Sequence, residues 1–351
     1  QSPMLSWIKG FSYTNYRELQ SLILERGIDS LSQQTCACII QELNNKKASG
    51  ECVAFWLPFI EGKVHKCSCY NILNILEGQN DSRVILGLAK LLLTVSPNVS
   101  SDFNASKEVE PTLPLEQGFS IKALEKKIDI LPKPEKYSLW DFCCRELEHA
   151  DDITTRYGKG PCIYFELLRP AIEDDEADGG IPDQTGTGAL IDITRDTGLK
   201  LLEETPKDAR VLVQRHLSSH SELMMRIGIY LLCKSNLSAA NKLGYVIDND
   251  LLGNIKLRHE TFCLLSNTYL VATKEKKEEL ISYINSTFFS KEDERLNAYG
   301  HFNIYSWLKR TAPDDALLLE QISKIKQDYP EFEEREHPDR SIFIGSVKTY
   351  S

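Results

Sequence analysis

The chain has 351 residues, of which 42% are hydrophobic and 26% are charged, so it is long enough to bury a large core as two domains or as one elongated array of repeats. It carries 51 acidic against 41 basic residues and a formal net charge of −10, which disfavours direct binding to the phosphates of nucleic acids. No apolar run approaches the ~18 residues of a membrane-spanning helix, so the sequence predicts no membrane segment.

The ten cysteines indicate a reducing compartment. They are too sparse for a disulfide scaffold, and most lie inside apolar runs, as Cys143, Cys144 and Cys233 do, which is typical of buried thiols. Residues 1–10 lack the basic start and the apolar core of a signal peptide. We therefore expect a cytoplasmic protein, and because Gln1 is not an initiator methionine, we expect the chain to be part of a longer one.

Residues 1–96 are predicted to form N-terminal helical repeats. Apolar residues recur there with the period of amphipathic helices, and Gly27, Gly62 and Gly78 separate the periodic segments. Residues 97–118 contain three prolines and have no period, so we predict a linker or long loop. The helices are expected at Tyr16–Arg26, Ser32–Leu43, Gly50–Ile60, Cys69–Leu76 and Arg83–Leu93.

Residues 119–351 are predicted to form C-terminal helical repeats, which begin with helices at Ser120–Ile130 and Leu139–His149. An insertion at residues 173–196 is rich in Asp, Glu and Gly, so we expect it to be exposed and not helical throughout. Beyond it, positions i, i+4 and i+8 are apolar in two segments, which places them on one face of a helix. These positions are Leu223, Ile227 and Leu231 in the first segment, and Leu280, Ile284 and Phe288 in the second.

Three further segments read as helix starts, with a capping hydroxyl followed by a carboxylate that suits the exposed N–H groups of a first turn. They are Thr205-Pro-Lys-Asp208, Ser290-Lys-Glu-Asp293 and Thr311-Ala-Pro-Asp314. Recurrent starts of one kind predict recurrent helical hairpins. The sequence therefore predicts an all-α protein, built as an α-solenoid of antiparallel hairpins that is TPR-like or HEAT-like with irregular repeat length. An extended tail is expected at Ser341–Tyr350.

The cysteine pairs of the N-terminal part do not predict a zinc site. Structural zinc favours Cys-x-x-Cys, because that turn lets both sulfurs reach one tetrahedral ion. Cys67 and Cys69 are separated by a single residue, and so are Cys36 and Cys38. We expect these cysteines to be buried thiols.

Other candidate motifs also lack essential members. His216 and His220 are four residues apart, but Leu217 stands where a metalloprotease helix requires Glu, so we expect solvated histidines. Gly186-Thr-Gly188 lacks the Lys of a phosphate-binding loop, and the carboxylates of Glu173–Asp178 do not fit an EF-hand. The sequence thus nominates no catalytic, cofactor-binding or metal-ligating residue, predicts no cofactor or enzymatic activity in this region, and leaves the partner-binding residues unknown.

Short helix patterns between residues 200 and 345 recur in a form that one protein family shares. Arg226-Ile-Gly-Ile-Tyr-Leu-Leu232 resembles an "R-x-A-L-x-L-L" helix, Arg258-His-Glu-Thr-Phe-Cys-Leu-Leu265 an "H-E-x-x-x-L-L" helix, and Lys277–Ile284 an "L-x-x-I" helix. Tyr305-Ser-Trp-Leu308 resembles a "W-L" segment, Glu336-His-Pro-Asp339 an "H-P-D-F" segment with Arg340 in place of the aromatic residue, and Gln1-Ser-Pro3 an "S-P" start. Together they resemble the C-terminal helical-repeat region of the antiviral STAND NTPases of the AVAST (Avs) type.

The resemblance implies a sensor. In that family the repeats recognise a phage protein, such as the large terminase or the portal, by its fold, and binding releases an ATPase that oligomerises and activates an effector. Both of those domains lie outside the repeat region, so oligomerisation is expected through domains outside this chain.

Two other readings remain open at this point. In the second reading, the chain is a cytosolic helical-repeat adaptor that assembles host proteins and has no immune role. In the third, it is an enzyme whose site forms only in three dimensions.

Overall fold

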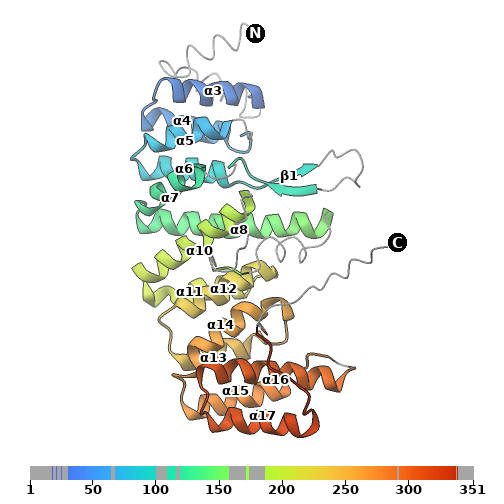
Figure 1. The fold of residues 1–351 in the computed structure, drawn as a ribbon. Helices are drawn as coiled ribbons and strands as arrows, with labels where there is room; N and C mark the ends of the chain where they lie inside the picture. The colour runs from blue at the N-terminus through green and yellow to red at the C-terminus, as the bar shows by residue number, and fades with distance from the viewer. Residues whose placement is uncertain are drawn as a thin grey trace, which may run out of the picture. The chain divides into compact units, whose positions relative to one another are not determined.

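The computed structural model describes residues 31–64, 68–99, 109–115, 119–157, 171–173, 186–290 and 292–336, together with residues 18, 21, 25 and 338. These residues form fourteen α-helices, two short 3-10 helices and one two-stranded hairpin, which confirms the prediction of an all-α fold (Figure 1). Among the described residues, no helix combines the length and the apolar character that crossing a membrane requires. The solenoid arrangement stays a prediction.

The chain divides into two compact units. Unit 1 comprises residues 1–170 and 175–205, and unit 2 comprises residues 171–174 and 206–351. The division follows Thr205, whereas the sequence predicted a linker or long loop at residues 97–118. The short segment 171–174 belongs to unit 2, although the residues on both sides of it along the chain belong to unit 1.

The first described helices of unit 1 follow the predicted pattern closely. Oxygen atoms of Ser32, Ser49 and Asp81 accept backbone N–H groups and cap three of these helices, which fixes where each one starts. The fully buried Trp56 lies in the apolar core that the helices share. The four helices are α3 (Gln33–Asn45), α4 (Gly50–Ile60), α5 (Cys69–Glu77) and α6 (Ser82–Leu93).

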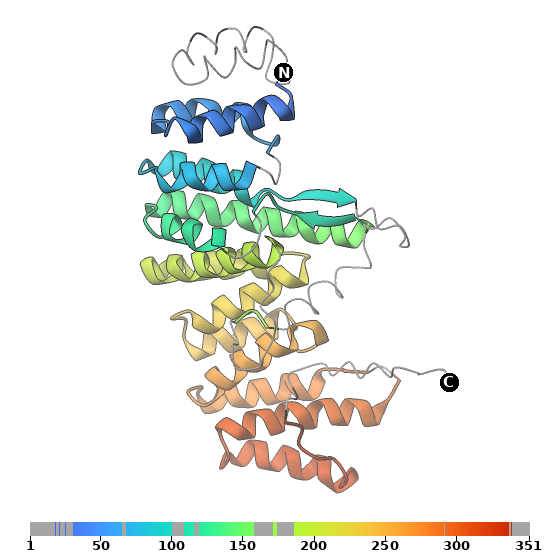
Figure 2. The ribbon, with the colours of Figure 1, turned by 45° about the horizontal axis from the view of Figure 1, so that its top comes forward.

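A β-hairpin occupies part of the predicted linker. Strands β1 (Ser96–Val99) and β2 (Val109–Thr112) pair antiparallel and extend beside α8 (Figure 2). The prediction of a linker or long loop was wrong for these strands, because prolines are tolerated in a two-stranded ribbon, where each strand has a free edge. Leu113 and Leu115 follow β2 and are buried, and the N–H of Leu115 donates to the carbonyl of Leu92, so the returning chain is fastened to α6.

The rest of unit 1 corrects the predicted insertion. Helices α7 (Phe119–Asp129), α8 (Lys133–Tyr157) and α10 (Gly186–Glu204) follow the hairpin, and α10 packs along α8. Residues 186–196 are therefore helical, and many are buried, whereas we expected an exposed segment. The acidic and Gly-rich composition masked a helical stripe at i, i+3, i+7 and i+11, formed by Leu190, Ile193, Thr197 and Leu201, all of which are buried. Residues 174–185 lie outside the described part.

Unit 2 is a succession of helices in which each contacts close neighbours in the chain. Contacts join α11 to α12, α12 to α14, α14 to α16, and α16 to α17. The helices are α11 (Ala209–Leu217), α12 (Glu222–Lys234), α13 (Ala239–Asp248), α14 (Arg258–Tyr269), α15 (Lys274–Ser286), α16 (Glu294–Thr311) and α17 (Ala316–Asp328), with 3-10 turns η4 (Pro206–Asp208) and η5 (Ile255–Leu257) before α11 and α14.

The predicted apolar faces of unit 2 are confirmed with one exception. All three apolar positions on α12 are buried, and so are Leu280 and Ile284 on α15. Phe288 is 74% exposed, because α15 ends at Ser286 and the helical period no longer applies beyond that residue.

The predicted capping residues were displaced. Asp293 caps α16 and accepts from the N–H of Leu296, and Asp315 caps α17, so in both cases a carboxylate closer to the helix replaces the expected hydroxyl. Thr311 is instead the last residue of α16, and α11 begins only at Ala209, after η4. The extended tail at Ser341–Tyr350 lies outside the described residues, as does the helix at Tyr16–Arg26 apart from residues 18, 21 and 25.

Candidate functional site

A buried ion pair joins α12 to α14. The guanidinium of Arg226 donates through Nε to both carboxylate oxygens of Glu260, at 3.0 and 3.1 Å, and through Nη2 to Oε1 at 2.8 Å. The two side chains are only 5% and 3% exposed. A planar guanidinium that donates several hydrogen bonds to one carboxylate is the geometry in which a buried pair recovers the cost of leaving water.

Glu260 also holds the short segment that precedes α10. The backbone N–H of Ile172 donates to Oε1 of Glu260 at 3.2 Å, and the Ile172 side chain is fully buried. Residues 171–173 are thereby fastened to the first turn of α14, even though 88 positions separate Ile172 from Glu260 along the chain. The next residue, Glu173, consequently has its side chain at the surface of α14.

The first turn of α14 presents different residues on two faces. Glu260 points into the core toward α12, while the preceding residue, His259, lies on another face. Cys263 is four residues beyond His259, so the two side chains are neighbours on one helical face. The 3-10 turn η5 positions this first turn, with Asn254 capping the turn through the N–H of Lys256.

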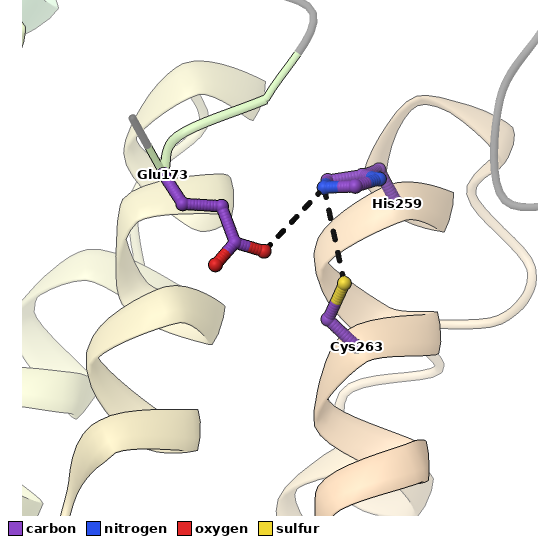
Figure 3. A group of neighbouring side chains, drawn as sticks. All are labelled: Glu173, His259 and Cys263. Atoms are coloured by element: carbon purple, nitrogen blue, oxygen red, sulfur yellow. Dashed lines mark hydrogen bonds and ion pairs between the residues drawn. The ribbon is translucent and has the colours of Figure 1, made fainter. Parts of the chain in front are cut away.

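Three metal-ligating side chains meet on that face. Nε2 of His259 lies 3.7 Å from Oε1 of Glu173 and 3.8 Å from Sγ of Cys263, and the three ligand atoms all lie within 4.8 Å of one another. All three residues are half-buried. Figure 3 shows that the carboxylate, from one segment, and the thiol, from the helix, approach the same ring nitrogen.

A second thiol lies near this cluster without being part of it. The side-chain amide of Asn267 donates to Sγ of Cys233 at 3.5 Å and to the carbonyl of Cys263 at 2.8 Å. Burial raises the pKa of the Cys233 thiol, although the positive charges of Lys242 and Lys234 oppose the shift. Cys233 lies beside the cluster but is not among its three ligand atoms, so it provides a natural comparison for Cys263.

The cluster does not have the arrangement of a Cys–His–carboxylate hydrolase. In that arrangement the carboxylate orients the ring through one nitrogen while the nucleophile contacts the other. Here Glu173 and Cys263 both face Nε2 of His259. Convergence of three donor atoms on one point suits the coordination of an ion better than it suits proton relay.

The histidines considered from the sequence are not brought together as a site. His216 is fully buried, which corrects the expectation that it is solvated, whereas His220 is exposed. The reason is that His216 continues a buried stripe on α11 with Leu212 and Val213, and α12 packs on that stripe at Gly228.

The remaining sequence candidates are scattered. Cys69 is buried at the start of α5, Cys36 is buried in α3 with its thiol directed to the carbonyl of Phe59 at 3.7 Å, and Cys38 is half-buried. Cys67 lies outside the described residues. The segment Gly186-Thr-Gly188 forms the first turn of α10.

Sequence reasoning did not find His259 and Cys263. Their i, i+4 spacing was readable inside the segment Arg258–Leu265, but it became meaningful only once that segment was known to be a helix. Glu173 was considered only as one of the carboxylates of Glu173–Asp178, and its place beside α14 depends on a tertiary hydrogen bond through Ile172. The composition of residues 173–196 indicated only an exposed acidic segment.

Exposed apolar side chains offer a second kind of candidate site, a surface for a macromolecule. Of the large apolar residues that the structure describes, the most exposed are Tyr70 in unit 1 and Val271 and Phe288 in unit 2, at 73%, 72% and 74%. A pocket of about 540 Å³ also opens in unit 2, where Leu296 and Phe332 are among its lining residues. Single exposed apolar residues are common, so they gain meaning only together with other evidence for a partner.

Comparisons with protein-family models, with curated proteins and with solved structures found no match to this chain. The proposals that follow rest on the contacts described above and on the segments that carry the resemblance to STAND NTPases.

Proposed function

We propose that this chain is the protein-binding sensor region of an antiphage STAND NTPase, and that it recognises a folded phage protein of the large-terminase or portal type. On this proposal, ATP binding, oligomerisation and effector activity belong to domains outside this chain. The region itself supplies surface and no chemistry.

The observation that carries the proposal is that the segments resembling the family contact one another. Arg226 of the first segment forms the buried ion pair with Glu260 of the second. Nε1 of Trp307, in the later "W-L" segment, donates to the carbonyl of Phe262 in the second segment at 2.8 Å, and the two rings are 5.7 Å apart. The shared Arg, Glu and Trp are thus residues that join α12 to α14 and α14 to α16.

This distribution of residues fits a recognition scaffold. Interior residues that join helices are the ones that a family of repeats has in common, while the outward-facing residues are left to vary with the partner. Recognition of a whole fold requires a large contact area, of more than ~1,000 Å², in which a few anchors dominate. Exposed apolar residues such as Phe288 are suited to such anchoring.

A pull-down from infected cells tests the proposal. The tagged chain is expressed in bacteria, with and without phage infection, and the retained proteins are identified by mass spectrometry. We expect a terminase or portal protein to be enriched only after infection. Recovery of host proteins alone, equal in both cultures, would favour the adaptor instead.

Surface variants make the test specific. Tyr70→Asp, Val271→Asp and Phe288→Asp each replace a side chain that is largely outside the core, so each variant should fold and keep its circular dichroism spectrum. At least one should lose the phage protein. Lys274→Asp is the matched control, because the Lys274 side chain is 76% exposed and its replacement also adds negative charge but removes no apolar surface.

A further inference from the structure

We propose that Glu173, His259 and Cys263 form a binding site for one Zn²⁺ ion in unit 2. The donor set is a carboxylate oxygen, an imidazole nitrogen and a thiolate sulfur, which are the three kinds of ligand that zinc takes in proteins. The sulfur excludes a preference for Mg²⁺ or Ca²⁺, which bind through oxygen. None of the sequence motifs considered above assigns this site, and the proposed sensor function does not assign it either.

The two distances measured from the imidazole of His259 fit ligands of one tetrahedral ion. With metal–ligand bonds of about 2.0–2.3 Å, the nitrogen and oxygen ligands of zinc lie about 3.4 Å apart, and nitrogen and sulfur about 3.6 Å apart. The corresponding distances from Nε2 of His259 are 3.7 Å to Glu173 and 3.8 Å to Cys263. Each contact needs to shorten by only a few tenths of an ångström, which small side-chain rotations allow.

The distance to Glu173 is poor for hydrogen bonding. At 3.7 Å, the contact between Nε2 of His259 and Oε1 of Glu173 is longer than a true N–H···O hydrogen bond. One ring nitrogen also carries at most one proton, so it cannot donate well to the carboxylate and to Cys263 together. A cation among the three atoms is coordinated by all of them at once.

Neighbouring contacts hold the ligands in place before any ion binds. The helix fixes His259 and Cys263 one turn apart, and the hydrogen bond from Ile172 to Glu260 fixes the backbone that carries Glu173. Arg226 in turn fixes the Glu260 carboxylate. Zinc would therefore tie residues 171–173 to α14, with a water molecule as the fourth ligand on the half-exposed side.

Cobalt substitution tests the site in the full chain. The reduced, chelator-treated protein is titrated with Co²⁺, whose charge-transfer absorption reports a bound thiolate, and Zn²⁺ is then added in competition. We expect one equivalent of Co²⁺ with a thiolate band, displaced by one equivalent of Zn²⁺. Absence of the band in the unaltered chain would overturn the proposal.

Variants assign the ligands. Cys263→Ser should abolish the thiolate band, and His259→Gln should weaken binding by more than the ~10–100-fold typical of losing an outer-shell partner. Cys233→Ser is the matched control and should keep both band and affinity, because the Cys233 thiol hydrogen-bonds with Asn267 outside the cluster. A band that persists in Cys263→Ser, or disappears in Cys233→Ser, would overturn this assignment.

Hydrogen exchange of residues 171–173 provides a second measurement, which reports on the protein segment and not on the metal ion. Bound Zn²⁺ should slow hydrogen exchange of the backbone amides in residues 171–173, and Glu173→Gln should remove that effect while leaving the circular dichroism spectrum unchanged. If zinc slows exchange equally in the chain and in Glu173→Gln, the carboxylate is not a ligand and the three-residue site is refuted.

Discussion

The Arg226–Glu260 ion pair gives the sharpest quantitative prediction about unit 2. Replacing Arg226 with Met keeps most of the side-chain volume but leaves the buried Glu260 carboxylate without its positive partner, while the N–H of Ile172 still donates to it. Removing one member of a buried pair costs about 3–5 kcal/mol, because the other charge stays in a poorly solvating interior. We expect Arg226→Met to destabilise α12 and α14 by that amount.

The double variant Arg226→Met, Glu260→Leu should recover most of the loss. Replacing both charges with apolar groups of similar size is often close to neutral. The remaining cost is the N–H of Ile172, which loses its acceptor, and an unsatisfied buried donor costs about 1–3 kcal/mol. The double variant should therefore be more stable than Arg226→Met, although it carries one more substitution.

Hydrogen exchange with mass spectrometry is the suitable measurement, because a chain with two compact units need not unfold in one step. Protection of amides in α12 and α14 should fall by about two to three and a half orders of magnitude in Arg226→Met. Peptides from α8, in unit 1, serve as the internal reference. Glu260→Leu alone completes the cycle. If the double variant loses the sum of what Arg226→Met and Glu260→Leu lose singly, the two charges are not coupled and the reasoning fails.

Two further predictions concern glycine substitutions and the dependence of stability on pH. Gly228→Ala should lower the midpoint of urea unfolding, because the added Cβ would lie 2.7 Å from Cβ of His216. Gly244→Ala should raise the midpoint, with a gain of about 0.5–1 kcal/mol in the free energy of unfolding, because its added Cβ meets only one side-chain atom, at 4.0 Å. Burial raises the pKa of Asp315, but the ion pair with Lys277 and two backbone N–H groups outweigh that effect and hold the pKa below its ordinary value. A carboxyl whose pKa is lower in the folded than in the unfolded state stabilises the fold at pH values above the unfolded-state pKa, and this contribution is lost as the pH falls through the folded-state pKa. The difference in stability between the chain and Asp315→Asn should therefore shrink as the pH is lowered below about 4.

The parts of the fold that local patterns specify were predictable from the sequence. Helix α4 has the predicted bounds, Gly50–Ile60, because a capping serine precedes it and a glycine with positive φ, Gly62, follows it. The three buried positions of α12 were equally readable from their period. In these segments, one helical face is apolar and the ends carry their own signals, so no distant contact is needed to define them.

Other elements depend on contacts that a local pattern does not contain. The hairpin of β1 and β2 requires Ser96 to pair with Thr112, and its prolines argued for a loop. Helix α10 packs on α8 and has two buried threonines, Thr194 and Thr197, and an acidic, Gly-rich segment precedes it. Burial of polar residues against a neighbouring helix is a tertiary property, and a hydrophobic pattern alone underestimates it.

The candidate site shows the same division within a few residues. His259 and Glu260 are adjacent in sequence, yet one faces the half-buried cluster and the other the core, because a helix turns about 100° per residue. The Glu260 carboxylate accepts both Arg226 and the N–H of Ile172, so one buried charge joins two helices and also positions the segment that carries Glu173. The third ligand of the proposed zinc site thus depends on an ion pair to which it does not belong. A substitution at Glu260 should consequently disturb both the packing of the segments that resemble the STAND family and the geometry of the metal cluster, whereas a substitution at Glu173 should disturb the cluster alone.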